Sequence, residues 1–294
     1  MYTIEHKREQ GYLEVNNATN SLHAKIYLSQ GASLQELKLG DHKIINDLSP
    51  LVYSDTYASS ILFPFANRVK DGNYEFEGKT FQLEKNQKEE GNALHGFVYN
   101  KSFKILETKT NKDYAVVKLS YSESNQTKGF PFTFLIEVSY TFYEDNVELL
   151  VSVKNTDEKA FPFTIGWHPY FTSADLYNSS IVFDSNKKLE IGDRNITTGV
   201  RDFNIGSKFE LKDKQLDDCW ILNSDEVLFK TPKYNLRFNS SAKNNFLQAY
   251  TPEKENSIAI EPTTGVSDSF NNQIGLQVLQ PDETYRITWT IKIT

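Results

Sequence analysis

The sequence of 294 residues contains a single cysteine, Cys219, so no disulfide can form within the chain. Basic residues are also in the minority: 32 Lys and Arg stand against 39 Asp and Glu, which gives a formal net charge of −7. The basic residues are scattered, whereas a polyphosphate partner requires a basic stripe. The composition therefore predicts no nucleic-acid partner.

Long apolar runs are missing as well. No stretch approaches the roughly 20 apolar residues that a membrane-spanning helix needs, and the polar N-terminal residues 1–7 do not have the apolar segment of a signal peptide. We therefore expect a cytoplasmic protein with no membrane partner, present as a monomer or a homodimer.

Aromatic residues are abundant, at 13% of the chain, with 20 Phe and 16 Tyr. Large flat side chains favour β-strands. Apolar and polar residues alternate strictly over 285–293 and over 134–142, and after a polar turn the alternation resumes over 147–153. A period of two predicts strands with one buried face, and the last two segments predict a long hairpin.

Further segments predict shorter strands, and turn residues recur at short intervals between them. These are a hairpin over 74–83 and strands over 24–28, 114–121, 180–183 and 257–260. No window has the period of a long amphipathic helix, and no linker or internal repeat divides the chain. The sequence predicts an all-β fold, a large antiparallel β-sandwich, with residues 1–294 forming a single domain.

Polar residues inside apolar segments are the candidates for chemistry. Asn67 and Arg68 directly follow the apolar run 63–66, and His95 precedes Gly96, where the backbone bends or approaches another segment closely. The guanidinium of Arg68 can present a planar set of donors to hydroxyls or a carboxylate. An ion pair at a strand end for Arg68, and a structural histidine for His95, are the plainer interpretations.

Two further candidates lie in more apolar surroundings. His168 stands among aromatic residues in the segment 162–171, and Glu261 follows the apolar run 258–260. A carboxylate at such a position is costly unless it is paired or used in function. A core histidine and a salt-bridged strand end remain the alternatives.

Two lesser candidates lie between them in the sequence. Asp217 and Asp218 are adjacent carboxyl residues before an apolar strand, and Gln248 lies within a strand-like run.

Together these segments resemble the aldose 1-epimerase (galactose mutarotase) family. The matching motifs occur in the family's order, and they are Ala-Asn-Arg-Val-Lys-Asp-Gly, Asn-Ala-Leu-His-Gly, Trp-His-Pro-Tyr-Phe, Leu-Asp-Asp-Cys-Trp, Leu-Gln-Ala-Tyr-Thr and Ile-Glu-Pro-Thr-Thr-Gly-Val. They cover residues 60–270. The resemblance implies a galactose mutarotase-like β-sandwich with an open carbohydrate-binding cleft.

The resemblance also implies a role for each matched residue. Glu261 corresponds to the general base of the family and His168 to its general acid. The substrate-binding or supporting groups implied are His95, Arg68, Asn67, Asp217 and Gln248. Asp217 rather than Asp218 matches the motif, and a shift of one residue would turn the side chain to the other sheet face. The chain departs from the family in being shorter than its best-known members and in having the bulky Trp167 before the histidine.

Mutarotation requires one base for the anomeric hydroxyl and one acid for the ring oxygen, on opposite sides of the C1–O5 bond. Nothing is oxidised or transferred, so we expect no cofactor and no metal site, in keeping with five widely spaced histidines. The reference pKa values are about 4.3 for Glu and about 6.5 for His. We therefore expect a neighbouring acceptor or carboxylate to hold His168 cationic near neutral pH.

Three alternatives remain open from the sequence. A glycoside hydrolase would use Glu261 and Asp217 as a carboxylate pair, but would leave both histidine motifs without a role. A sugar-binding module would use the same cleft without turnover. A hexose-6-phosphate 1-epimerase would share the fold and the acid–base chemistry but needs cationic groups for the phosphate.

Overall fold

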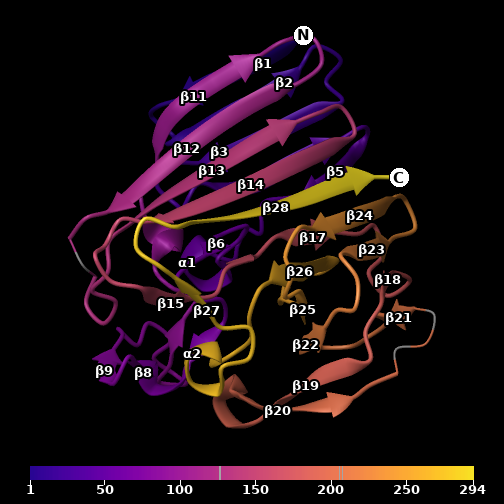
Figure 1. Ribbon diagram of the computed structural model, residues 1–294. Coiled ribbons are helices and arrows are strands. Elements are labelled where there is room, and N and C mark those ends of the chain that lie inside the picture. The colour runs from indigo at the N-terminus through magenta and orange to yellow at the C-terminus, as the bar shows by residue number, and fades with distance from the viewer. Residues whose placement is uncertain (126, 205, 207) are drawn as a thin grey trace.

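The structure is a computed structural model that describes residues 1–125, 127–204, 206 and 208–294. It is built almost wholly from antiparallel strands, and two large sheets form stacked layers in its upper half (Figure 1). The first sheet has the order β1 (Tyr2–Lys7), β2 (Tyr12–Asn17), β3 (Leu22–Tyr27), β4 (Ser33–Leu39), β5 (His42–Ile45). The second has the order β11 (Lys104–Thr110), β12 (Ala115–Glu123), β13 (Phe134–Phe142), β14 (Asn146–Asn155), β28 (Thr284–Ile293), β24 (Asn235–Ser240), β23 (Glu226–Lys230), β18 (Ser180–Phe183), β21 (Phe209–Glu210).

A third sheet of eight strands occupies the lower half of the molecule. Its order is β20 (Thr197–Asp202), β19 (Lys187–Ile191), β22 (Asp217–Ile221), β25 (Phe246–Tyr250), β26 (Ser257–Thr263), β16 (Gly166–Trp167), β6 (Ile61–Leu62), with β17 (Tyr170–Thr172) also paired to β26. Three two-stranded ladders complete the strands: β7 (Arg68–Val69) with β10 (Ala93–Leu94), β8 (Asn73–Phe76) with β9 (Lys79–Gln82), and β15 (Phe161–Phe163) with β27 (Gln277–Leu279).

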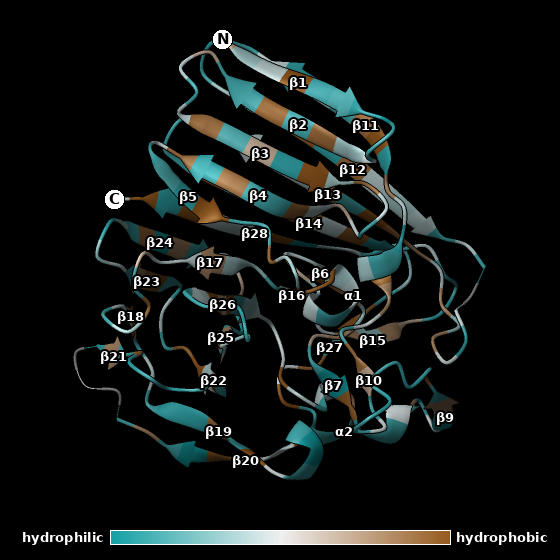
Figure 2. Ribbon diagram, turned by 180° about the vertical axis from the view of Figure 1, so that it is seen from behind, coloured by the Kyte–Doolittle hydropathy of each residue, from teal (hydrophilic) through white to brown (hydrophobic). Residues whose placement is uncertain are grey.

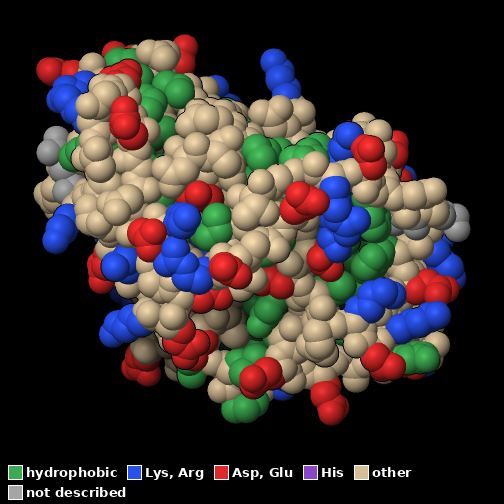
Figure 3. Space-filling view, turned by 90° about the horizontal axis from the view of Figure 1, so that it is seen from below, with side chains coloured by type: hydrophobic (Ala, Val, Ile, Leu, Met, Phe, Trp, Pro, Cys, Tyr) green, Lys and Arg blue, Asp and Glu red, His purple; other side chains and the backbone are tan. Residues whose placement is uncertain are grey.

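Among the residues that the structure describes, helical structure is limited to short turns. The elements are α1 (Tyr53–Thr56), α2 (Ser269–Asn272) and the 3-10 turns η1 (Lys70–Gly72), η2 (Val98–Asn100) and η3 (Asp193–Asn195). Within the described ranges, no helix has both the length and the apolar character that crossing a bilayer would require. Acidic and basic side chains are interspersed on the face of the molecule seen from below (Figure 3).

The all-β prediction is confirmed, and alternation explains the sandwich. Every second residue of β13 and of β14 is buried, and Val138, Val151 and Ile287 lie side by side across β13, β14 and β28. Every second residue of β2 and β3 is buried as well, and apolar and polar residues alternate along these strands in Figure 2. The apolar faces of both sheets therefore meet in one core, which the phenol of Tyr140 crosses to donate a hydrogen bond to the carbonyl oxygen of Ala32, 2.9 Å away.

The main difference from the predicted strand boundaries is at the end of β26. The predicted strand over 257–260 continues to Thr263, so Glu261 lies within β26 and does not follow its end. The reason is that β25 runs beside it over the added residues, where Gln248 pairs with Glu261 and Leu247 with Pro262.

Candidate active site

Three neighbouring strands of the eight-stranded sheet place polar side chains on one face. Cys219 of β22, Gln248 of β25 and Glu261 of β26 lie opposite one another in register. Asp217 precedes Cys219 by two residues, so its side chain lies on the same face. The amide Nε2 of Gln248 donates a hydrogen bond to Oδ1 of Asp217 at 2.6 Å. The register thus gathers Asp217, Gln248 and Glu261.

His168 reaches this face from the turn between β16 and β17. The preceding side chain, Trp167, points into the core, where it stacks on Trp289 of β28 with ring centroids 6.4 Å apart. The His168 backbone is fixed from both sides, because its N–H donates to the Ser60 carbonyl at 3.0 Å and its carbonyl accepts from the Ser59 N–H at 2.8 Å. The bulky Trp167 therefore anchors the strand and leaves the next side chain to face the cleft.

The imidazole and the carboxyl group meet directly. Nε2 of His168 lies 3.4 Å from Oε1 of Glu261, and the two residues are 5% and 3% exposed. This corrects the expected arrangement of an acid and a base on opposite sides of a sugar, since no pyranose ring fits between atoms in contact. However, the ring oxygen and the anomeric hydroxyl are both bonded to C1. Two adjacent side chains on one wall of the cleft can therefore each face one of these two oxygen atoms.

The segments carrying Asn67, Arg68 and His95 form a second part of the site. Arg68 pairs with Leu94 across the β7–β10 ladder, and the His95 N–H donates to the Asn67 carbonyl at 2.8 Å. Asn67 and His95 both have left-handed backbones, with φ of 61° and 60°, a conformation that is uncommon outside glycine and clusters at functional sites.

The close backbone approach predicted at Gly96 is confirmed. A Cβ at this residue would lie 2.1 Å from the carbonyl oxygen of Phe63, so glycine is required there. The ring of the preceding His95 packs edge-on against that of His168, with centroids 5.1 Å apart.

All of these side chains line one cleft. Its volume is about 180 Å³. The lining residues are Asp55, Thr56, Tyr57, Asn67, Arg68, Gln87, Leu94, His95, His168, Tyr170, Asp217, Gln248, Tyr250 and Glu261. The structure therefore brings together all seven residues singled out from the sequence. Asp218 is turned away, and its carboxylate pairs with Lys188 at 2.5 Å.

Burial sets the protonation of the acid–base pair. It raises the pKa of Glu261 well above its ordinary value, with a further rise from the Asp217 charge and an opposing effect from Arg68. Burial also lowers the pKa of His168 to about 4. The expectation that a neighbour holds His168 cationic is therefore wrong, because the adjacent carboxyl is itself driven toward its neutral form. Between the two pKa values the pair holds one proton.

The other buried groups of the cleft follow the same physics. The pKa of His95 is lowered well below its ordinary value by burial, by His168 and by Arg68, so this ring is neutral. Burial raises the pKa of Asp217. Nδ1 of His95 and Nδ1 of His168 are buried with no hydrogen-bond partner in the described part of the chain. Unpaired buried nitrogens are costly to stability.

Sequence reasoning did not single out the tyrosines of the cleft. Tyr170 stacks on His168 with ring centroids 5.0 Å apart, and Tyr57 packs edge-on against His95 at 4.9 Å. Tyr170 and Tyr250 stand within the quoted motifs Trp-His-Pro-Tyr-Phe and Leu-Gln-Ala-Tyr-Thr, which was a usable signal. Tyr57, in a short turn after α1, gives no signal in the sequence.

The family follows from comparison with known proteins. The model of the aldose 1-epimerase family matches residues 13–292, so the chain belongs to the aldose 1-epimerase family. Among characterised sequences it is 25% identical to the galactose mutarotase of Rattus norvegicus over 221 residues, 70% of this chain and 63% of that protein. It is 23% identical to the uncharacterized protein YihR of Escherichia coli K12, over 94% of this chain and 92% of that one.

Solved structures agree on the fold. A galactose mutarotase-like protein from Clostridium acetobutylicum superimposes with a TM-score of 0.86 at 18% identity, covering 100% of this chain and 98% of that one. Galactose 1-epimerase from Lactobacillus acidophilus superimposes with a TM-score of 0.80, also at 18% identity, with coverage of 100% and 98%. The chain therefore has the galactose mutarotase-like β-sandwich fold.

Proposed function

We propose that this protein is a cofactor-independent aldose 1-epimerase, which interconverts the α and β anomers of a hexose. The observation that carries the proposal is the buried contact of 3.4 Å between Glu261 and His168 in the wall of a sugar-sized cleft. Membership of the aldose 1-epimerase family supports the reaction class.

In the proposed reaction, the Glu261 carboxylate takes the proton of the C1 hydroxyl while the His168 imidazolium gives its proton to the ring oxygen. The C1–O5 bond breaks as the C1 carbonyl forms. Rotation about C1–C2 and reclosure along the reverse proton path give the other anomer, and both side chains recover their starting states. Each such group contributes about 10²–10⁴-fold to a rate.

The shared proton must lie on His168 when the ring opens. The positive charge of Arg68 lowers the pKa of Glu261 and so favours the carboxylate form. A sugar that hydrogen-bonds to the carboxylate and to the imidazolium stabilises the same distribution, because hydrogen bonds to a charged form favour that form.

The remaining groups bind the sugar in this proposal. Asp217 and Gln248 exchange hydrogen bonds with its hydroxyls, and Asn67, Arg68 and His95 also line the cleft. The aromatic faces of Tyr57 and Tyr170 suit the C–H surface of a pyranose.

The experiment that tests the proposal is polarimetry of freshly dissolved α-glucose and α-galactose with the wild-type protein. We expect mutarotation faster than the spontaneous reaction for at least one of the two hexoses. Equilibration at the spontaneous rate with both sugars would contradict the proposal. A parallel assay with an aryl glycoside separates the hydrolase alternative, because a mutarotase releases no aglycone.

A further inference from the structure

Arg68 is the only Lys or Arg among the described residues that line the cleft. Its side chain is 11% exposed, and three neighbours accept its N–H groups. Nε donates to Oε2 of Glu90 at 2.8 Å and to Oε1 of Gln87 at 3.1 Å, while Nη1 donates to Oδ1 of Asn67 at 3.0 Å. The guanidinium is therefore held in one orientation, and one of its three partners is charged.

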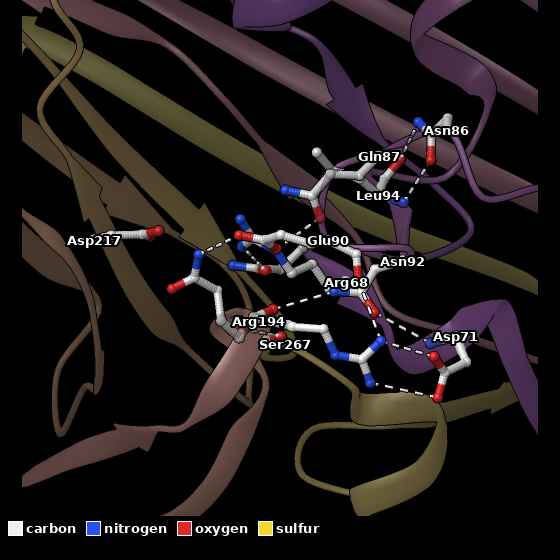
Figure 4. A network of polar contacts seen from close by, with 12 residues as sticks. Arg68, Asp71, Asn86, Gln87, Glu90, Asn92, Leu94, Arg194, Asp217 and Ser267 are labelled. Atoms are coloured by element: carbon white, nitrogen blue, oxygen red, sulfur yellow. Dashed lines mark hydrogen bonds and ion pairs between the residues drawn. The ribbon is translucent and has the colours of Figure 1, made fainter.

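Glu90 is itself fixed from outside the cleft (Figure 4). Its second carboxylate oxygen, Oε1, accepts a hydrogen bond from Nδ2 of Asn195 at 2.7 Å. The neighbouring Arg194 donates to the Glu90 carbonyl oxygen at 3.2 Å and to the Asp71 carboxylate at 2.8 Å. Both carboxylate oxygens of Glu90 are thus occupied, one by the cleft arginine and one by the 3-10 turn η3.

This arrangement affects the net charge of the cleft wall that a bound ligand would contact. Glu90 is not among the residues that line the cleft, but its carboxylate pairs with Arg68 and offsets part of the positive charge there. The carboxyl residues of the lining are Asp55, Asp217 and Glu261, so the described lining presents no excess positive charge to a bound molecule. An anionic sugar would have to enter this site without a free cation to pair with, which is costly in a partly buried cleft.

We propose that Glu90 is a specificity-determining residue, which positions Arg68 as a hydrogen-bond donor and offsets part of its charge so that the cleft takes neutral sugars and discriminates against anionic ones. The inference rests on the proposed function, since it concerns the substrate class of the same cleft. It assigns the discrimination to one ion pair behind the cleft wall.

The test compares Glu90→Gln with the wild type. Glutamine keeps an acceptor for Arg68, and Gln87 and Asn67 still orient the guanidinium, so the change removes charge more than geometry. Glu89→Gln is the matched control, because it removes the same charge from an exposed neighbour in the same loop. Dissociation constants are measured by calorimetry for galactose, galacturonate and galactose 6-phosphate at low ionic strength.

We expect Glu90→Gln to strengthen binding of the two anionic sugars relative to galactose by about tenfold, the order of one partly screened charge interaction. The gain should shrink as salt is added, and Glu89→Gln should behave as the wild type. Glu90→Ala, which also frees the guanidinium, should show the same change in preference together with weaker galactose binding. A merely structural role would weaken all three sugars alike.

An unchanged ratio of anionic to neutral affinity in Glu90→Gln would overturn the inference, and so would the absence of binding in all proteins. Because the readout is affinity, it is separate from turnover. A wild type that binds galactose but does not interconvert its anomers contradicts the proposed function alone, and the shift in preference then still decides the role of Glu90.

Discussion

Two buried glutamates in different parts of the molecule show what distinguishes a structural carboxyl group from a reactive one. Glu123 ends β12 in the sandwich and is 4% exposed, and Glu261 lies in β26 of the cleft sheet and is 3% exposed. Their surroundings differ in hydrogen bonding. The carboxylate of Glu123 accepts from the Tyr121 and Thr127 hydroxyls, both at 2.8 Å, and from the Asn125 N–H at 3.1 Å.

The pKa values of these two carboxyl groups are therefore shifted in opposite directions. Burial disfavours the charged form of Glu123, but the three donors outweigh it and lower the pKa of this carboxyl. At Glu261 burial and the charge of Asp217 raise the pKa, and the charge of Arg68 lowers it. The net result is a pKa well above the ordinary value. Glu261 lies deeper in the protein than Glu123 and lacks the donors that Glu123 has, and both differences raise its pKa relative to that of Glu123. Glu123 is therefore a fixed carboxylate, whereas Glu261 can exchange a proton.

The largest contrast should be in turnover. Glu261→Gln should reduce the rate of anomer interconversion by about 10²–10⁴-fold, because the amide cannot take the proton of the C1 hydroxyl. Sugar binding, measured by calorimetry, should be retained. The matched change Glu123→Gln, at the far end of β12, should leave the rate per folded molecule unchanged. Equal losses in the two variants would show that burial, and not the lack of donors, governs function.

For the free energy of unfolding, we expect the reverse order: Glu123→Gln should have the larger effect and Glu261→Gln the smaller. Glu123→Gln places an amide among three donors, which leaves one of them poorly paired, and should lower the free energy of unfolding by about 1–3 kcal/mol. Glu261→Gln removes a carboxyl that burial disfavours in its charged form and should not lower stability at pH 7. Urea unfolding followed by circular dichroism measures both. A larger loss in Glu261→Gln would contradict the comparison.

The pH dependence of stability should separate the two groups further. The lowered pKa of Glu123 makes a contribution that is present above the ordinary value of 4.5 and is lost as the pH falls below it. The raised pKa of Glu261 makes a contribution that is present below 4.5 and is lost as the pH rises toward the raised value.

Glu123→Gln should therefore flatten the acid side of the stability curve and Glu261→Gln the neutral side, each by up to about 1.4 kcal/mol per pH unit. Unfolding curves at intervals between pH 3 and pH 8 check this. Identical curves for the two variants would refute the assignment of opposite shifts.

The smallest contrast concerns two adjacent aspartates. Asp217→Asn weakens a group that faces the cleft and should lower sugar affinity by about tenfold, the order of a hydrogen bond to a charged group. Asp218→Asn removes only the partner of Lys188 and should change affinity by less than about twofold, since Asp218 does not line the cleft. Titration calorimetry compares them, and an equal effect would show that the strand register assigned to β22 is wrong.

The sequence predicted the sandwich well because its strands follow a simple rule. Alternation in β13, β14 and β28 is a local pattern, and burial of one face follows from it. It could not predict where β26 ends, because the partner strand β25 is what extends it past Glu261.

The seven candidate residues of the cleft could be found because polar residues in apolar strands conflict with the local pattern, and because the motifs resembled a family. Their geometry could not be predicted. The 3.4 Å contact between His168 and Glu261 depends on strands that are 93 residues apart in the chain, and the lowered pKa of His168 is a result of burial that no motif encodes. Glu90, in an exposed-looking acidic loop, gave no signal, since its partners Arg68 and Asn195 come from distant segments.

The pH–rate profile of anomer exchange, measured by NMR with the wild type, tests most directly whether Glu261 and His168 act through one shared proton. We predict a rate that is constant through pH 6.5 and falls on the acid side with a midpoint near 4. Below that pH both His168 and Glu261 are protonated, so the pair holds two protons and has no base. His168→Asn should remove that limb together with most of the rate. A midpoint near 6.5, or a profile that His168→Asn leaves unchanged, would contradict the account.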